Sequence, residues 1–288
     1  MKTFLASLGA AAVLLAGTAA FAGQPTPWQM TMPEPATGIM EQISWFEQYT
    51  LWFIVPITLF VLFLLAWCIL KFRASVNATP SRTSHNTLIE VIWTVGPVVL
   101  LLMLAVPSFQ LLTAQYNPEE EPEITIKATG VQWSWDYEYQ GEEPIRFSSF
   151  MLQDADRAQF GKEDVAAYPR LLAVDNDIVV PVNTTVRLLV TASDVIHAFA
   201  MPAFGVKADA VPGRINETYF RAEREGIFYG QCSELCGKDH AYMPIAIRVV
   251  SEELYGEWQT AAVDNVDEAN RALIAALEEN RTVADAGN

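Results

Sequence analysis

Basic residues are scarce in this 288-residue chain, which has 18 lysines and arginines against 34 aspartates and glutamates and a formal net charge of −16. Over residues 116–258 the count is 24 acidic side chains against 12 basic ones. Such a surface repels the phosphate backbone, so nucleic acid is excluded as a natural partner. The acidic excess either serves solubility alone or attracts a basic protein partner.

Charge of either sign is missing from two long apolar runs, 51–70 and 91–109. At about 1.5 Å per residue in a helix, each run can cross a hydrocarbon core of roughly 30 Å. The basic residues nearby all lie in the loop between the runs: Lys71, Arg73 and Arg82. This asymmetry predicts a transmembrane hairpin with helices over about 48–71 and 88–112, a cytoplasmic loop, and both termini on the opposite side.

The first 22 residues form another apolar segment, which we interpret as a cleaved secretory signal. Lys2 supplies the positive charge, residues 4–15 form the apolar core, and Ala20-Phe21-Ala22 offers a cleavage site of the A-x-A type. A short membrane anchor fits less well, because the core is short and ends in small residues. Residues 23–115 then comprise the N-terminal segment and the hairpin. The chain is expected in a bacterial inner membrane, with its termini and external domain in the periplasm.

The external domain, residues 120–258, consists of short apolar stretches separated by turn residues. ITIKATGVQWSWDYEY (124–139) alternates apolar and polar positions, VRLLVTA (186–192) is typical of a buried strand, and MPIAIRVV (243–250) closes the set. Several short strands over this length predict an all-β sandwich or barrel. Residues 259–288 are rich in alanine and charge, and their spacing predicts a helical, acidic tail.

Cysteine and histidine are also scarce, with three of each in the whole chain. Cys68 lies in an apolar run and His85 in the loop that follows it. The others all lie in the external domain: His197, Cys232, Cys236 and His240. Three of these four share the stretch GQCSELCGKDHAYMP (230–244) with Met243. A domain that uses cysteine and histidine nowhere else is expected to use them for one purpose.

Three interpretations of this cluster are open on the residues alone. A Cys232–Cys236 disulfide is allowed outside the cytoplasm, but it explains neither the histidines nor Met243. A zinc site with two cysteines and two histidines fits the ligand count and leaves the methionine unused. Thiolate, imidazole and thioether together are copper ligands, although a single blue-copper ion would leave one thiolate over. Two cysteines could instead bridge two copper ions, each capped by one histidine.

Four stretches together closely resemble subunit II of the haem-copper cytochrome c oxidases. They are TLIEVIWTVGP (87–97), GVQWSWDYEY (130–139), DVIHAFAMPAFGVKADAVPGR (194–214) and GQCSELCGKDHAYMP (230–244). The resemblance runs over residues 45–258 with the motifs in the family's order, and the signal segment makes the chain look like a bacterial member. It implies a two-helix transmembrane hairpin followed by an all-β, cupredoxin-like barrel or sandwich.

The resemblance also implies a dinuclear copper centre, called CuA. Its ligands would be His197, Cys232, Cys236, His240, Met243 and the main-chain carbonyl of Glu234. The Glu234 side chain would face the catalytic subunit and help to bind a magnesium or manganese ion, for which a carboxylate is suited. Taken alone, Glu234 also fits an exposed loop acid.

Further roles carry over from the family. Trp133 matches the tryptophan that receives electrons, although its spacing with Trp135 also fits a place in the core. Three acids match positions around the docking site for basic cytochrome c: Glu138, Asp175 and Asp194. Glu90 matches a carboxylate at the mouth of a proton-uptake pathway, although an acid favoured by the helix dipole at an N-terminus would look the same.

Three positions depart from the family pattern. Val131, Ser134 and Phe199 stand where histidine, tyrosine and tryptophan are common. None of them is an implied copper ligand, so the departures bear on the details of the electron-input surface and on the pose of the docked partner.

The implied function is the electron-input subunit of cytochrome c oxidase. Reduced cytochrome c would deliver electrons to CuA, and these would pass to subunit I, which reduces oxygen to water with proton pumping. The chain has too few histidines for that second set of centres, so it is expected to be part of an enzyme, assembled with subunit I and other oxidase subunits in the lipid membrane. The alternatives are a copper-binding or copper-delivery module, which needs exposed ligands, and a quinol oxidase subunit, which lacks the copper ligands.

Overall fold

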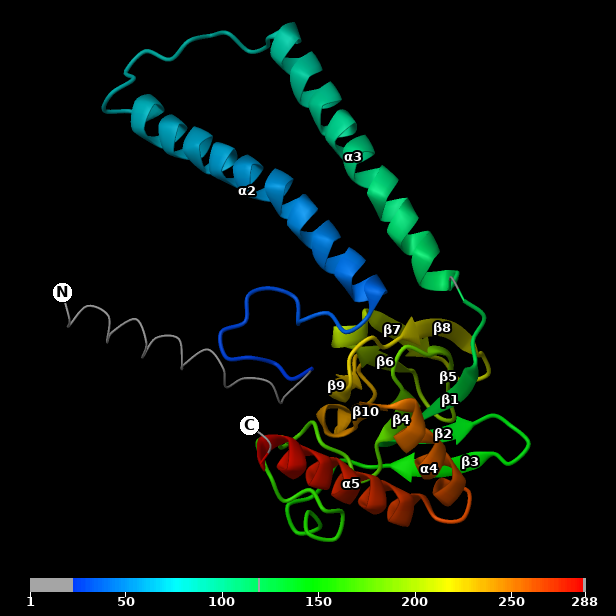
Figure 1. Cartoon of the computed structure of the whole chain (residues 1–288). Coiled ribbons are helices and arrows are strands. Elements are labelled where there is room, and N and C mark those ends of the chain that lie inside the picture. Colours follow the sequence, from blue (N-terminus) through cyan, green and yellow to red (C-terminus); the bar gives the residue numbers. More distant parts are fainter. Residues whose placement is uncertain (1–22, 119, 287–288) are drawn as a thin grey trace, which may run out of the picture. The chain divides into compact units, whose positions relative to one another are not determined.

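The computed structural model describes residues 23–118 and 120–286 (Figure 1). The expected signal segment, residues 1–22, lies outside the described residues. The chain divides into two compact units, one formed by Glu41–Ala114 and the other by the chain up to Met40 together with the chain from Gln115 onward. The first unit holds most of two long helices, and the second holds every strand that the structure describes.

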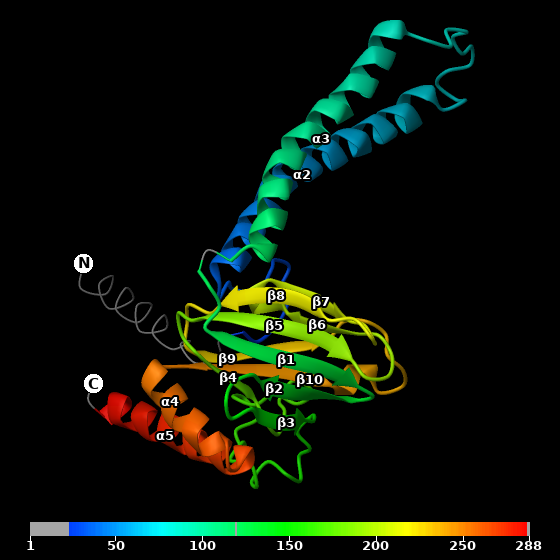
Figure 2. The same ribbon diagram turned by 90° about the vertical axis from the view of Figure 1, so that its right-hand side faces the viewer.

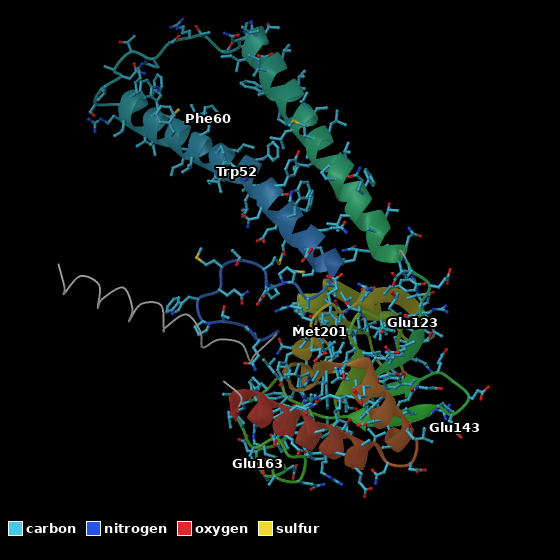
Figure 3. The ribbon with its side chains drawn as sticks, viewed as in Figure 1. Trp52, Phe60, Glu123, Glu143, Glu163 and Met201 are labelled. Atoms are coloured by element: carbon cyan, nitrogen blue, oxygen red, sulfur yellow. The ribbon has the colours of Figure 1, made fainter. Side chains whose placement is uncertain are left out.

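Two apolar helices account for the first unit. α2 spans Gly38–Phe72 and α3 spans Thr87–Tyr116, and each contains a long apolar stretch. Among the described residues, these two helices are long and apolar enough to cross a membrane. Their large apolar side chains are exposed, as Trp52 and Phe60 on α2 illustrate (Figure 3). The predicted pair of spans is confirmed as two helices that can cross a membrane.

Both helices extend beyond the expected bounds. α2 begins at Gly38 rather than near residue 48, because a polar cap and not the apolar run determines its first turn. The hydroxyl of Thr37 accepts a hydrogen bond from the main-chain N–H of Met40 (3.1 Å), as an N-cap residue does. At the start of α3 the side-chain carbonyl of Asn86 accepts from the N–H of Ile89 in the same way (3.2 Å).

The second unit contains two five-stranded sheets within its described residues (Figure 2). The first sheet has the order β3-β2-β1-β5-β8: β1 (Ile124–Val131), β2 (Ser134–Tyr139), β3 (Ile145–Ser149), β5 (Thr185–Ala192) and β8 (Asn216–Arg221). The second has the order β4-β10-β9-β6-β7: β4 (Ile178–Pro181), β6 (His197–Met201), β7 (Val206–Ala210), β9 (Gly226–Cys232) and β10 (Pro244–Val250). Each sheet is mixed, because β1 pairs with β5 and β10 with β4 in parallel. The predicted β-sandwich domain, consistent with a cupredoxin-like fold, is confirmed.

The core of this domain is filled by side chains that alternate along the strands. On β2, Trp135, Tyr137 and Tyr139 are buried. The second sheet contributes Phe199 and Met201, both wholly buried, and Figure 3 shows Met201 inside the domain. Burying one such side chain contributes roughly 1.5–3 kcal/mol, so the domain has a stabilising apolar core of its own.

A buried ion cluster fastens the long segment 150–177 to the second sheet. Lys162 is wholly buried and donates to Asp177 Oδ1 (2.8 Å) and to two main-chain carbonyls. Arg248 on β10 donates to Asp177 Oδ2 through Nη2 (2.6 Å) and Nε (3.0 Å). Burial alone would raise the pKa of Asp177, but Lys162 and Arg248 outweigh it and hold that pKa below its ordinary value.

The end of the chain forms two helices that pack together, α4 (Glu252–Ala262) and α5 (Val266–Ala286) (Figure 1). Ser251 caps α4, and its hydroxyl accepts a hydrogen bond from a main-chain N–H of the first turn (3.3 Å). Trp258 is buried and donates through Nε1 to Asn270 Oδ1 on α5 (2.7 Å). The expected division between domain and tail at residue 259 therefore falls inside α4, because Trp258 anchors the middle of a helix.

Candidate metal centre

The sheet pairing brings the ends of three strands together. His197 begins β6, Cys232 ends β9, and Met243 directly precedes β10. Because β9 pairs antiparallel with both β6 and β10, these three residues lie at the same end of the sheet. The connection from β9 to β10, which includes the short helix η3 (His240–Tyr242), carries the other two: Cys236 and His240.

Each cysteine thiol faces one imidazole nitrogen. The two Sγ atoms lie 3.9 Å apart. Cys232 Sγ is 3.8 Å from His197 Nδ1, and Cys236 Sγ is 3.5 Å from His240 Nδ1. His197, Cys232 and Cys236 place their ligand atoms within 4.8 Å of one another. The arrangement is paired, with one thiol and one imidazole in each half.

Two weaker donors complete the cluster. The main-chain carbonyl of Glu234 lies 3.4 Å from Cys232 Sγ, and the thioether sulfur of Met243 lies 3.5 Å from Cys236 Sγ. Cys232, Cys236 and Met243 are between 1% and 6% exposed, so the sulfur atoms are shielded from water. The structure thus brings together all six donors that the resemblance implied.

The donor set fits a soft metal ion. Two sulfurs bound to one metal ion at about 2.3 Å lie roughly 3.8 Å apart at the tetrahedral angle, whereas a disulfide needs about 2.05 Å. Both Cys232 and Cys236 are free thiols, so the disulfide interpretation does not describe this structure. Thiolate and thioether sulfur beside imidazole suit copper.

Without a metal ion the Cys236 thiol holds its proton. Burial and the neighbouring Cys232 raise the pKa of the Cys236 thiol to about 12. A metal binds the thiolate rather than the thiol, so metal binding must displace protons here.

The fully buried Trp135 contacts two of the ligand residues. Its ring lies edge-on to the His197 ring, with the centroids 6.0 Å apart, and its indole N–H donates to the main-chain carbonyl of Met243 (3.3 Å). Gly130, opposite Trp135 in the β1–β2 pair, leaves room for the same imidazole, because a Cβ there would lie 2.7 Å from His197 Cδ2. Sequence reasoning placed Trp135 in the core and did not single out Gly130, although a glycine inside a strand can signal such a close approach.

Trp133 lies in the turn between β1 and β2 and is half-buried rather than part of the inner layer. Its indole N–H donates to the main-chain carbonyl of Cys236 (3.3 Å), and Gln132 Nε2 donates to the same oxygen (2.7 Å). Gly237 has a φ of +127°, and a Cβ there would lie 2.9 Å from the Trp133 ring. The Lys238 ammonium lies 5.5 Å from the centre of that ring. The turn therefore touches the ligand loop directly.

The three expected docking acids lie in different surroundings. Glu138 on β2 accepts a hydrogen bond from Arg146 (2.8 Å), which lowers the pKa of Glu138. Asp175 is half-buried; burial raises its pKa, although hydrogen bonds from two main-chain N–H groups oppose the rise. Asp194 is bonded to the ligand His197, with 3.0 Å between Asp194 Oδ1 and His197 Nε2. The three acids have different hydrogen-bond partners among the described residues.

Two other predicted residues lie apart from these contacts. Glu90 is in the first turn of α3, where its carboxylate accepts a hydrogen bond from the N–H of Asn86 (3.3 Å). That contact is the one expected of an acid at a helix N-terminus. The Glu234 side chain is exposed on the ligand loop next to the exposed Leu235.

The fold and the site define a class: a membrane-anchored metalloprotein with a buried sulfur and imidazole site at one end of a β-sandwich. Comparison with known families identifies the family within this class. The profile of "Cytochrome C oxidase subunit II, periplasmic domain" matches residues 124–250, and that of "Cytochrome C oxidase subunit II, transmembrane domain" matches residues 25–111. The chain belongs to the cytochrome c oxidase subunit II family, whose members are subunits of an oxidoreductase complex.

Individual relatives agree along nearly the whole chain. A probable cytochrome c oxidase subunit 2 of Rickettsia bellii is 45% identical over 285 residues, which is 99% of this chain and 98% of the relative. Cytochrome c oxidase subunit 2 of Cereibacter sphaeroides is 43% identical over 286 residues, covering 92% and 93%. Among solved structures, the periplasmic domain of subunit II of the Bradyrhizobium japonicum cytochrome oxidase is similar, with 54% identity, 51% of this chain and 98% of that chain covered, and a TM-score of 0.46.

Proposed function

We propose that this chain is the electron-input subunit of a cytochrome c oxidase. It accepts electrons from reduced cytochrome c at a dinuclear CuA centre and passes them to the haem and copper centres of subunit I, where oxygen is reduced to water and protons are pumped. The observation that carries the proposal is the pairing in the cluster, where two buried free thiols each face one imidazole. Each half also has one weaker donor, the Glu234 carbonyl beside Cys232 and the Met243 sulfur beside Cys236, which a single zinc ion with two cysteines and two histidines would leave unused.

Each ligand residue has a defined part in this proposal. The thiolates of Cys232 and Cys236 and the imidazoles of His197 and His240 would hold the metal, and the Met243 sulfur and the Glu234 carbonyl would serve as weaker donors. Copper bound there supplies a carrier of single electrons. The protein keeps water away from the sulfur atoms and holds the donors in a rigid frame, so that little movement accompanies electron transfer.

The Trp133 turn is the proposed place where electrons arrive. Trp133 is half-buried at the surface, and its indole N–H donates to the main-chain carbonyl of the ligand residue Cys236. A donor docked over this turn lies one hydrogen bond from the ligand loop. The acidic character of the domain suits a basic donor such as cytochrome c, with Glu138, Asp175 and Asp194 as contributors to the field.

We also propose roles for Glu234 and Glu90 from the family resemblance, and an orientation in the membrane from the distribution of basic residues. The exposed Glu234 carboxylate is free of protein contacts among the described hydrogen bonds and could help to bind magnesium or manganese against subunit I. Glu90 would lie at the mouth of a proton-uptake pathway. The basic residues between the two spans favour a cytoplasmic loop, with the copper domain and both termini in the periplasm of a bacterial inner membrane.

The alternative functions fit less well. A copper-delivery module needs exposed, exchangeable ligands, whereas His197 and the sulfur donors here are almost completely buried. A quinol oxidase subunit would lack the copper ligands, and all of them are present in this chain. Both alternatives would also leave the contact between Trp133 and the ligand loop without a role.

Metal content and electron spin resonance of the purified, assembled complex test the proposal. We expect two copper ions per chain beyond those of subunit I, and hyperfine structure from one unpaired electron shared by two copper nuclei. One localised copper ion per chain, or zinc in its place, would contradict the dinuclear proposal. Absence of metal from a fully reduced preparation would favour a copper-free oxidase subunit.

A further inference from the structure

We propose that Asp194 is a positioning residue of the metal centre, one that orients the ligand His197 and ties the Trp133 turn to it. This inference rests on the proposed copper function and assigns Asp194 a role other than that of a surface acid for docking. It follows from the hydrogen bonds of the carboxylate, the orientation of the imidazole, and the contacts of the neighbouring turn.

Both carboxylate oxygens of Asp194 are already engaged inside the domain. Oδ1 accepts from the main-chain N–H of Val195 (2.7 Å) and lies 3.0 Å from His197 Nε2, while Oδ2 accepts from the main-chain N–H of Gln132 (2.7 Å). The side chain is 30% exposed, so one edge still meets solvent. A carboxylate held by three donors has a defined position, unlike a freely rotating surface acid.

The imidazole of His197 is oriented by this contact. Its Nε2 points to Asp194, and its Nδ1 points to Cys232 Sγ at 3.8 Å. A carboxylate that accepts from Nε2–H selects the tautomer in which Nδ1 carries the lone pair, and Nδ1 is the nitrogen that faces the cluster. Asp194 thereby makes His197 a ligand through one particular atom and increases the basicity of that atom.

The same carboxylate connects the ligand to the Trp133 turn. Gln132 donates its main-chain N–H to Asp194 and its side-chain amide to the carbonyl of Cys236 (2.7 Å). The turn therefore contacts proposed ligands on two different segments: His197 at the start of β6 through Asp194, and Cys236 in the connection from β9 to β10 directly. Displacing Asp194 would loosen the turn at which electrons are proposed to arrive.

The exposed acid Asp136 on β2 offers a matched control. Its carboxylate accepts from the Ser148 hydroxyl (2.6 Å), and within the described part of the chain it makes no hydrogen bond to a proposed ligand. Asp194→Asn and Asp136→Asn each remove one negative charge from the domain. They differ in that only the first leaves the N–H of Gln132 facing an amide and weakens the contact to His197.

The test compares these two variants in the purified oxidase complex, first with no cytochrome c present and then in turnover with cytochrome c. For Asp194→Asn we expect altered copper hyperfine structure, a higher midpoint potential of the copper centre, and about 10–100-fold weaker retention of copper against a chelator. Asp136→Asn should match the parent in all three. If Asp194→Asn has the parental spectrum, potential and copper retention and is impaired only in turnover with cytochrome c, Asp194 is a docking acid and the inference is wrong.

Two further outcomes are distinguishable. Equal shifts in both variants would mean a general charge effect and would also overturn the inference. A parental complex without the two copper ions would instead contradict the proposed function. If Asp194→Asn does not assemble, Asp194→Glu provides the test, because it keeps the charge but displaces the carboxylate: a shifted spectrum supports the positioning role, and a parental one overturns it.

Discussion

Two buried polar clusters of the β domain differ in how well their donors and acceptors are matched. In the cluster of Lys162, Asp177 and Arg248, ammonium and guanidinium groups meet a carboxylate at 2.6–3.0 Å. In the cluster of Cys232, Cys236 and Met243, sulfur atoms meet one another at 3.5–3.9 Å. The first network satisfies itself, whereas the second collects lone pairs that only a cation can satisfy.

The difference separates a structural network from a ligand site. Buried polar groups are normally hydrogen-bonded within the protein, so a buried cluster of matched charges needs no further explanation. A buried cluster of unmatched soft donors costs stability and indicates a ligand that is not part of the chain. Breaking the ion cluster should therefore lower the stability of the fold and spare copper binding, whereas breaking the sulfur cluster should abolish copper binding and largely spare the fold.

The largest effect is expected from Cys236→Ser. Replacing one of the two thiolates removes the paired arrangement, so the dinuclear copper signal and electron transfer from cytochrome c should both be lost completely. The apolar core remains, and the cost to the metal-free fold should stay within about 1–3 kcal/mol for a buried hydroxyl. Copper analysis measures the loss of the dinuclear centre. Urea unfolding of the metal-free chain in detergent measures the change in the free energy of unfolding. A variant that keeps a dinuclear signal would remove Cys236 from the proposed ligands.

Asp177→Asn should destabilise the fold and leave the copper centre unchanged. It leaves Lys162 and Arg248 buried without their shared carboxylate, and removing one partner of a buried ion pair costs about 3–5 kcal/mol. The unfolding midpoint in urea should fall strongly while the spectrum of the folded copper protein stays parental. Asp136→Asn, at an exposed position, should change the unfolding free energy by no more than about 0.5 kcal/mol. Equal stability of the two variants would show that the ion cluster is not structural.

The donors that the structure gathers could be picked out from the sequence because their signal is local. Cys232, Cys236, His240 and Met243 lie within twelve positions, and the scarcity of cysteine and histidine in the domain pointed to the distant His197. The alternation along residues 134–139 likewise predicted a strand with Trp135 inside. Contacts between segments far apart in the sequence were not predictable in this way.

Two such contacts show why. Asp194 and Gln132 are 62 positions apart, and Arg248 and Asp177 are 71 apart, so no spacing rule relates them. The motif placed Asp194 among docking acids because family patterns record which residue occurs and not which atoms it bonds. The start of α2 was placed too late for a related reason: Thr37 caps the helix before the apolar run begins.

The stability contributed by the buried ion cluster of Lys162, Asp177 and Arg248 should also depend on pH. Because the folded pKa of Asp177 lies below its unfolded value of about 3.9, the ionised carboxylate stabilises the fold at higher pH, and this contribution is lost as the pH falls from about 5 downward through the folded pKa. The parental chain should therefore lose stability over this acid range more steeply than Asp177→Asn, which has already lost the contribution. Urea midpoints of the metal-free chains at several pH values measure the slopes, and equal slopes would contradict the assignment.

The smallest effect is expected at the surface, where neither cluster is touched. Glu138 is only partly neutralised by Arg146 and Lys127, so its charge still contributes to the field that a basic donor meets. Charges further apart than about 10 Å are screened at 0.1 M salt, so turnover with cytochrome c should fall with ionic strength. Glu138→Gln should raise KM for cytochrome c about two- to five-fold at low salt, within the range of a single exposed charge pair, and should flatten the salt dependence.

Glu143→Gln, in the exposed loop between β2 and β3, is the matched control, since it removes the same charge from another exposed position on the domain. If the two variants weaken turnover equally, the donor responds to the overall charge of the domain and Glu138 has no local docking role.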